Sequence, residues 1–117
     1  MGKIYTIKQN GQFSRVYKKG VNIVGKNIAV YALKCKNSGE SQIGITVNRK
    51  LGGAVQRNRV KRLIREAYRT LSITEPQLFT GRYLFVFVAR ARCFGKKTKM
   101  QHIRRDIEFA LRKLNEE

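Results

Sequence analysis

The chain has 117 residues, of which 42% are hydrophobic, so one folded domain over 1–117 is expected and a disordered chain is excluded. Its 26 Lys and Arg residues against 7 Asp and Glu give a net charge of +19, and this self-repulsion predicts a polyanionic partner. Nucleic acid fits better than a membrane, because the sequence has neither a bulky amphipathic helix nor an apolar run of roughly 20 residues.

Seven elements are predicted along the chain, in the order helix, three strands, helix, strand, helix (αβββαβα). They are expected near residues 11–19, 21–24, 27–35, 42–48, 55–71, 82–89 and 98–114. Alternating hydrophobic residues predict the strands, and hydrophobic residues at helical spacing predict the helices. Ahead of them, the segment 1–8 has no apolar core and no cleavage site, so we expect no signal peptide and a cytoplasmic protein.

Capping and turn residues mark several boundaries. Asn10 can cap the first helix and Gly20 can end it, while Thr98 can cap the last helix. The segment 36–41, K-N-S-G-E-S, consists largely of residues that tolerate tight turns. We therefore expect a hairpin between the two strands that flank it.

The strand expected at 82–89, R-Y-L-F-V-F-V-A, is almost wholly apolar, which is typical of a strand buried on both faces. With the strand at 42–48 and the helix between them, it forms a strand–helix–strand unit. Such a unit predicts a parallel pair of strands with the helix packed on the sheet. The expected fold is a two-layer α/β (α+β) sandwich with a mixed sheet of about four strands.

The helix expected at 55–71 carries the most informative pattern. Its hydrophobic residues lie within about 60° of one line and form an ordinary core stripe: Val60, Leu63, Ile64, Ala67 and Leu71. The remaining surface is basic, whereas an ordinary solvated face would mix charges of both signs. We expect it to bind nucleic-acid phosphates through Arg57, Asn58, Arg59, Lys61, Arg62, Arg65 and Arg69. Within this set, Arg57 lies nearest the stripe and could reach the preceding loop.

The loop ahead of this helix contains Gly52 and Gly53 beside Arg49 and Lys50. Glycines before a helix allow the backbone to approach a phosphate. The bases next to them strengthen that interpretation.

Phe13, Tyr17 and Tyr31 form a second candidate site. One helix face and one strand face could bring these rings together as a stacking platform for unpaired bases. Packing in the core is the alternative, and the pattern alone favours it.

Side chains for catalysis or metal binding are sparse. No cluster of carboxylates could hold a catalytic magnesium ion, and His102, the only histidine, is expected on the surface. Cys35 and Cys93 are far apart in sequence, which is typical of reduced thiols that pack as small hydrophobic residues. We expect no catalytic residue and no metal site in the polypeptide.

The segment 43–68, I-G-I-T-V-N-R-K-L-G-G-A-V-Q-R-N-R-V-K-R-L-I-R-E-A-Y, resembles the signature of the protein subunit of bacterial ribonuclease P. At its centre is the R-N-R motif, here Arg57, Asn58 and Arg59. The segment 12–20 is similar to the family's first helix, and 27–33 to its first long strand. The resemblance therefore spans nearly the whole chain.

This resemblance implies more than the pattern shows. The family's protein assists a catalytic RNA, which uses bound magnesium to remove the 5′ leader from precursor tRNA. By resemblance, the basic helix would bind that RNA. Phe13, Tyr17 and Tyr31 would line a cleft for the single-stranded leader, flanked by Arg49 and Lys50, which reverses the preference for core packing. The resemblance also implies a left-handed βαβ crossover, against the usual right-handed rule, a monomer when free, and no cofactor on the protein itself.

Two other classes of protein would have the same basic charge. A ribosomal or RNA-chaperone protein would not prefer precursor tRNA over mature tRNA. A protein-only nuclease would cleave without an RNA subunit, and the missing carboxylate cluster argues against it.

Overall fold

The computed structural model describes residues 4–36, 39–95 and 98–116, and its elements follow the predicted order. They are α1 (Asn10–Lys19), β1 (Val21–Val24), β2 (Ile28–Cys35), β3 (Gln42–Thr46), α2 (Ala54–Thr74), β4 (Arg82–Ala89) and α3 (Met100–Asn115). Short 3₁₀ helices lie at Arg49–Leu51, Pro76–Leu78 and Ala91–Phe94. The predicted elements are confirmed, with differences at their ends.

Strand β4 is central in the sheet, whose order is β1-β2-β4-β3. It pairs antiparallel with β2 and parallel with β3, as the strand–helix–strand unit predicts. The hairpin expected at 36–41 is wrong, because β4 lies between β2 and β3 and separates them; residues 37 and 38 are outside the described residues. The physical reason lies in β4 itself: Phe85, Val86 and Phe87 are each at most 2% exposed, and a strand so apolar is buried best with neighbours on both edges.

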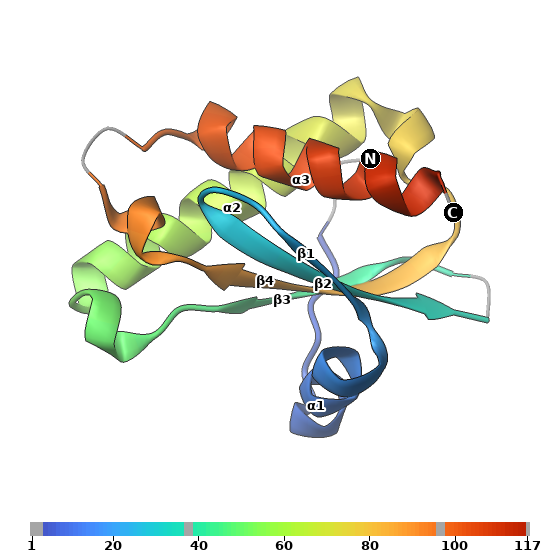
Figure 1. The fold of residues 1–117 in the computed structure, drawn as a ribbon, viewed down its shortest axis with the longest axis horizontal. Coiled ribbons are helices and arrows are strands. Elements are labelled where there is room, and N and C mark those ends of the chain that lie inside the picture. The colour runs from blue at the N-terminus through green and yellow to red at the C-terminus, as the bar shows by residue number, and fades with distance from the viewer. Residues whose placement is uncertain (1–3, 37–38, 96–97, 117) are drawn as a thin grey trace.

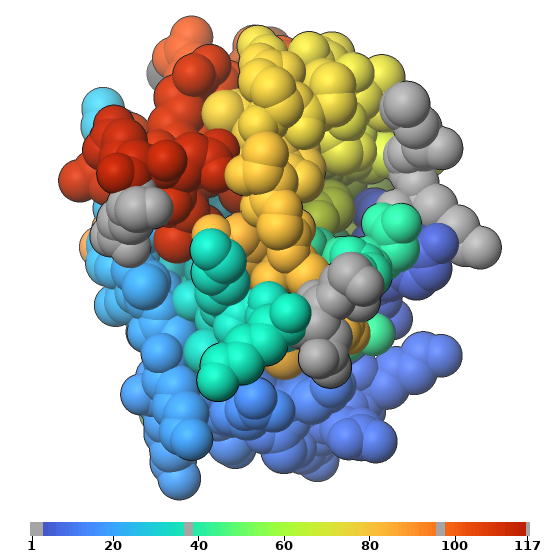
Figure 2. Space-filling view, turned by 90° about the vertical axis from the view of Figure 1, so that its right-hand side faces the viewer, coloured from blue at the N-terminus to red at the C-terminus, as the bar shows by residue number. Residues whose placement is uncertain are grey.

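Helices cover both faces of the sheet. Figure 1 shows α2 and α3 on one face and α1 on the other, and Figure 2 shows the same layering from the side. The larger core lies under α2 and α3 and includes Phe85 and Phe87. A smaller core lies under α1 and includes Val16, Leu84 and Val86. The α+β class and the mixed four-strand sheet are confirmed, while α1 adds a partial third layer to the two that were expected.

The first helix ends at Lys19 as predicted, but it begins differently. Asn10 lies inside the first turn of α1, and Gln9 precedes the helix without a side-chain cap. Gly20 does follow the last turn, and its N–H donates to the Val16 carbonyl at 2.8 Å. Its backbone is extended rather than left-handed. A carbon on Gly20 would approach the Val16 and Ala32 carbonyl oxygens closely, so the tight turn into β1 explains the glycine.

The sequence predicted that Thr98 caps α3, but the structure shows that it does not. Its hydroxyl donates to the Arg92 carbonyl at 2.8 Å, so it closes the loop before the helix. The N-terminal end of α3 is capped from within, because Nδ1 of His102 accepts from the Lys99 N–H at 2.9 Å. His102 is accordingly half-buried rather than freely exposed.

Helix α2 extends to Thr74, past the predicted end at 71. Glu75 leaves the helical conformation, as expected for a residue ahead of Pro76. At 21 residues α2 is long, yet no helix within the described ranges is apolar enough to cross a membrane.

Candidate nucleic-acid interface

The predicted hydrophobic stripe of α2 is the side that packs on the sheet and α3. Val60, Ile64, Ala67 and Leu71 are buried, and Leu63 packs against the same core. The pattern missed Tyr68, whose ring lies against those of Phe79, Phe85 and Phe87. Burial raises the pKa of Tyr68 to about 12, and the Glu40 charge adds to the shift. This phenol is therefore neutral and belongs to the core.

Two arginines of the basic helix are held by segments outside α2. Nη1 of Arg57 donates to the Gly52 carbonyl at 3.0 Å, which confirms its predicted reach into the preceding loop. Nη2 of Arg59 donates to the Thr98 carbonyl at 3.0 Å and ties α2 to the loop before α3. Each guanidinium keeps further N–H groups for a ligand, because arginine has five donors.

Arg69 is paired rather than free. Its Nη2 lies 2.9 Å from Oε1 of Glu66, one turn earlier on α2, and both side chains are about half exposed. An exposed pair of this kind contributes little to stability. It does lower the net positive charge at this end of the helix.

The remaining four residues form the open part of the basic surface, which we call the α2 basic face: Asn58, Lys61, Arg62 and Arg65. Asn58, Arg62 and Arg65 are exposed and Lys61 is half-buried. Within the described part of the chain, none of their side chains has a hydrogen-bond or ion-pair partner. Their donors and charges are available to phosphate groups of a polyanion.

The two glycines ahead of α2 differ: Gly52 is closely packed, whereas Gly53 is exposed with open space around it. The Gly53 N–H is occupied, because it donates to Oε1 of Gln56 at 3.1 Å. A carbon on Gly52 would lie 2.9 Å from the Phe94 ring, so close packing requires a glycine there. The phosphate contact predicted for this loop therefore falls to its bases, Arg49 and Lys50, both of which are exposed.

The three predicted aromatic residues do come together, and we call them the aromatic cluster: Phe13, Tyr17 and Tyr31. The rings of Tyr17 and Tyr31 meet edge to face with centroids 4.9 Å apart. The Tyr17 hydroxyl lies 2.9 Å from Oγ1 of Thr46. A carbon on Gly44 would overlap the Phe13 ring, so that ring lies directly on the sheet.

The three rings of this cluster differ in how deeply they are buried. Phe13 and Tyr31 pack on the smaller core, whereas Tyr17 is 38% exposed. Core packing is thus confirmed for Phe13 and Tyr31, while base stacking stays a prediction for Tyr17, whose ring rests against that of Tyr31. A half-exposed ring held at a fixed angle is what a stacked base requires.

The carboxyl end of β3 lies between the aromatic cluster and the start of α2. Because β3 and β4 are parallel, their carboxyl ends coincide, with Thr46 opposite Val88. Thr46 contacts the aromatic cluster, and the turn at Arg49–Leu51 leads from it into α2 (Figure 1). The register brings a basic segment that the sequence left unassigned, 90–92, to this same end. Its only signal was its position directly after the buried strand.

The thiols are not placed for chemistry. Both cysteines are free, and Cys93 is fully buried. Burial raises the pKa of the Cys93 thiol to about 11, the Asp106 carboxylate raises it further, and Arg59 opposes the shift. The thiol is therefore protonated near neutral pH. Among the residues that the structure describes, no three His, Cys, Asp or Glu side chains gather as metal ligands would.

The chain matches the family model for Ribonuclease P over residues 1–115. It is 46% identical over 84 residues to the ribonuclease P protein component of Clostridioides difficile strain 630, covering 72% of this chain and 70% of that protein. It is 44% identical over 69 residues to the ribonuclease P protein component of Staphylococcus aureus strain Mu3. That second match spans 59% of this chain and 60% of the relative, less than two-thirds of its length.

Solved structures with this fold include the RNase P protein of Staphylococcus aureus, with a TM-score of 0.76, 30% identity and 96% of each chain covered. The RNase P protein from Thermotoga maritima also has a TM-score of 0.76, covering 92% of this chain and 96% of that one. At 22% identity, that second likeness shows the fold alone.

Proposed function

The chain belongs to the ribonuclease P protein family, and from this premise we propose that it serves a ribonuclease P that removes the 5′ leader from precursor tRNA. The hydrolysis is carried out by a catalytic RNA with its magnesium ions. The protein supplies no catalytic residue and holds no cofactor of its own. It is a cytoplasmic, single-domain protein, a monomer when free, and it binds the catalytic RNA and the precursor.

One observation carries this proposal: the chain leads directly from one surface to the other, because Thr46 at the end of β3 contacts the aromatic cluster and the turn at Arg49–Leu51 continues into α2. The α2 basic face offers Arg62 and Arg65 without internal partners. The aromatic cluster offers the exposed ring of Tyr17 beside Thr46. A protein that needed only non-specific charge would not require the second surface.

The two surfaces suit two different RNA ligands. A structured RNA presents arrays of phosphates, which arginines on a rigid helix can contact in a fixed geometry. An unpaired leader presents the faces of its bases, which stack on Tyr17 while Arg49 and Lys50 contact its phosphates. In this proposal, the α2 basic face holds the catalytic RNA, and the aromatic cluster holds the leader.

Reconstitution with the cognate RNA tests the proposal. Added to that RNA at low magnesium, the protein should raise the affinity for precursor tRNA with a leader of several nucleotides, and leave mature tRNA affinity unchanged. Equal binding to precursor, mature tRNA and unrelated structured RNA would instead identify an RNA chaperone or ribosomal protein. Cleavage by the protein without any RNA subunit would identify a protein nuclease.

Substitution of Arg62 and Arg65 by Ala is expected to weaken binding to the catalytic RNA. Each lost phosphate contact should make the plot of log affinity against log salt shallower by about one unit. The control is Arg112→Ala on α3, which removes an exposed arginine away from α2. Affinity measured over a series of salt concentrations checks the result, and an unchanged slope for the double variant would rule out direct phosphate contacts.

A further inference from the structure

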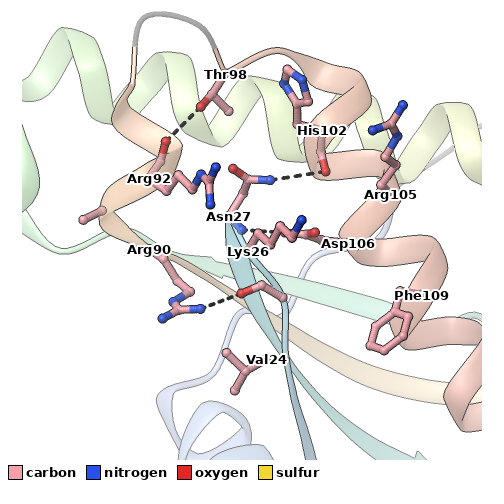
Figure 3. A pocket seen from close by; sticks show the side chains of 12 residues that line it. Val24, Lys26, Asn27, Arg90, Arg92, Thr98, His102, Arg105, Asp106 and Phe109 are labelled. Carbon is pink, nitrogen blue, oxygen red and sulfur yellow. Dashed lines mark hydrogen bonds between the residues drawn. The ribbon is translucent and has the colours of Figure 1, made fainter.

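A groove of about 1070 Å³ lies outside the surfaces described above (Figure 3). Its walls are α3 on one side and the segment after β4 on the other, and the β1–β2 turn lies between them. Four bases line it: Lys26, Arg90, Arg92 and Arg105. The acid among its lining residues is Asp106.

Asp106 does not neutralise these bases. Its Oδ2 accepts the backbone N–H groups of Asn27 at 2.7 Å and Ile28 at 3.1 Å, so the carboxylate fixes the β1–β2 turn on α3. Arg90 donates to a neutral group, the Gly25 carbonyl, at 2.6 Å. Within the described residues, no base of the groove forms an ion pair. The positive charge of the groove is thus left for an external anion.

One end of the groove is aromatic. Phe109 on α3 lines it and is 50% exposed. Nζ of Lys113 lies 5.1 Å from the centroid of its ring and adds another cation beside it. Cations next to an exposed ring are the combination that binds an unpaired nucleotide, with phosphate contacts from the cations and stacking from the ring.

The groove is also continuous with the basic helix. Arg59 of α2 donates to the Thr98 carbonyl, and Thr98 lines the groove. The aromatic cluster, by contrast, lies under α1 on the opposite face of the sheet. An RNA that lies on α2 can therefore reach this groove without crossing the sheet.

We propose that this groove is a second binding site for the catalytic RNA, which takes an unpaired nucleotide segment of that RNA. The phosphates lie against Lys26, Arg90 and Arg92, and a base stacks on Phe109. The inference rests on the proposed function, since its ligand is the catalytic RNA of that proposal. It goes further by assigning the catalytic RNA a contact on α3 and the β1–β2 turn.

Two variants test the groove: Phe109→Ala, which removes the ring, and the double variant Lys26→Gln, Arg92→Gln, which removes two cations. The matched control is Arg112→Gln, which removes an exposed arginine from the same helix but outside the groove. Because Phe109 is half exposed and the other side chains lie at the surface, all variants should keep the wild-type thermal midpoint.

We expect Phe109→Ala to weaken binding of the purified protein to the catalytic RNA by roughly 5- to 150-fold, the range for loss of one stacked base. The double variant should make the salt dependence shallower by roughly one to two units. Chemical probing of the RNA should show unpaired nucleotides that the wild type and Arg112→Gln protect and that Phe109→Ala leaves reactive.

Unchanged affinity and protection in both variants would overturn the inference, as would a loss confined to leader-bearing precursor. If the groove binds a protein instead, RNA affinity and protection should be unchanged in both variants. Arg62→Ala, measured in parallel, separates this failure from failure of the proposed function. If Arg62→Ala weakens RNA binding while the groove variants do not, only the groove assignment is wrong.

Discussion

Replacing Tyr17 by Ala is expected to lower the affinity of the reconstituted enzyme for precursor tRNA by roughly 5- to 150-fold, or about 1–3 kcal/mol, the loss measured when a stacked base loses its aromatic partner. Affinity for mature tRNA should not change, because it has no leader to stack. The exposed ring of Tyr17 stands edge to face on Tyr31, so its position is fixed before the leader binds. Equilibrium binding of both tRNA forms measures the difference.

Tyr17→Phe is the matched control. It keeps the ring and removes only the hydroxyl contact with Thr46, so we expect a loss of no more than about 1 kcal/mol. Equal losses for Phe and Ala would mean that the hydroxyl, rather than the ring face, contacts the leader. Equal losses for precursor and mature tRNA would point to damage to the smaller core, and a shifted thermal midpoint would accompany that outcome.

The sequence predicted the parts of this fold that depend on local periodicity. The stripe of α2 and the apolar run of β4 each repeat at the spacing of their own element, so one element's residues suffice to define the buried side. Hydrophobic residues of α3 also repeat at helical spacing, and Ile103, Ile107 and Leu111 are buried.

Contacts between segments far apart in the sequence could not be predicted, and the reason is physical. A turn-rich segment such as 36–41 shows that the chain reverses, but it does not show which strand lies alongside. That choice depends on where β4 gains the most burial. The predictions of helix caps were wrong for a similar reason. Asn10 and Thr98 are suitable residue types, but Asn10 lies inside α1 and the Thr98 hydroxyl donates to the Arg92 carbonyl.

The basic helix shows the same limit at the level of single side chains. Helical spacing placed all its bases on one surface, but it could not show that Arg59 reaches Thr98, 39 residues away, or that Arg69 is paired with Glu66. These two contacts distinguish Arg59, which ties α2 to the loop before α3, and the paired Arg69 from Arg62 and Arg65, whose side chains have no partner within the described residues. The distinction predicts larger losses of RNA affinity at Arg62 and Arg65 than at Arg69, where a phosphate must compete with a carboxylate.

The largest expected effect on stability comes from a residue that the sequence did not single out. Asp106→Ala should lower the free energy of unfolding by about 2–4 kcal/mol, because the backbone N–H groups of Asn27 and Ile28 both lose their acceptor in a partly buried site. The carboxylate is closely packed against the turn: a carbon on Gly25 would lie 2.7 Å from the Asp106 carboxyl carbon. Urea denaturation at neutral pH measures the loss.

Asp106→Asn distinguishes the acceptor from the charge. Both variants remove one negative charge from a chain of net charge +19, so any change in self-repulsion is the same in the two. The Asn side chain keeps a carbonyl oxygen that can accept both N–H groups, and we expect it to cost only about 1 kcal/mol, since its bonds are neutral rather than charge-assisted. If Asn costs as much as Ala, the carboxylate acts through its charge within the basic groove. If Ala costs less than about 0.5 kcal/mol, the β1–β2 turn does not depend on Asp106, and the groove beside it is not fixed before RNA binds.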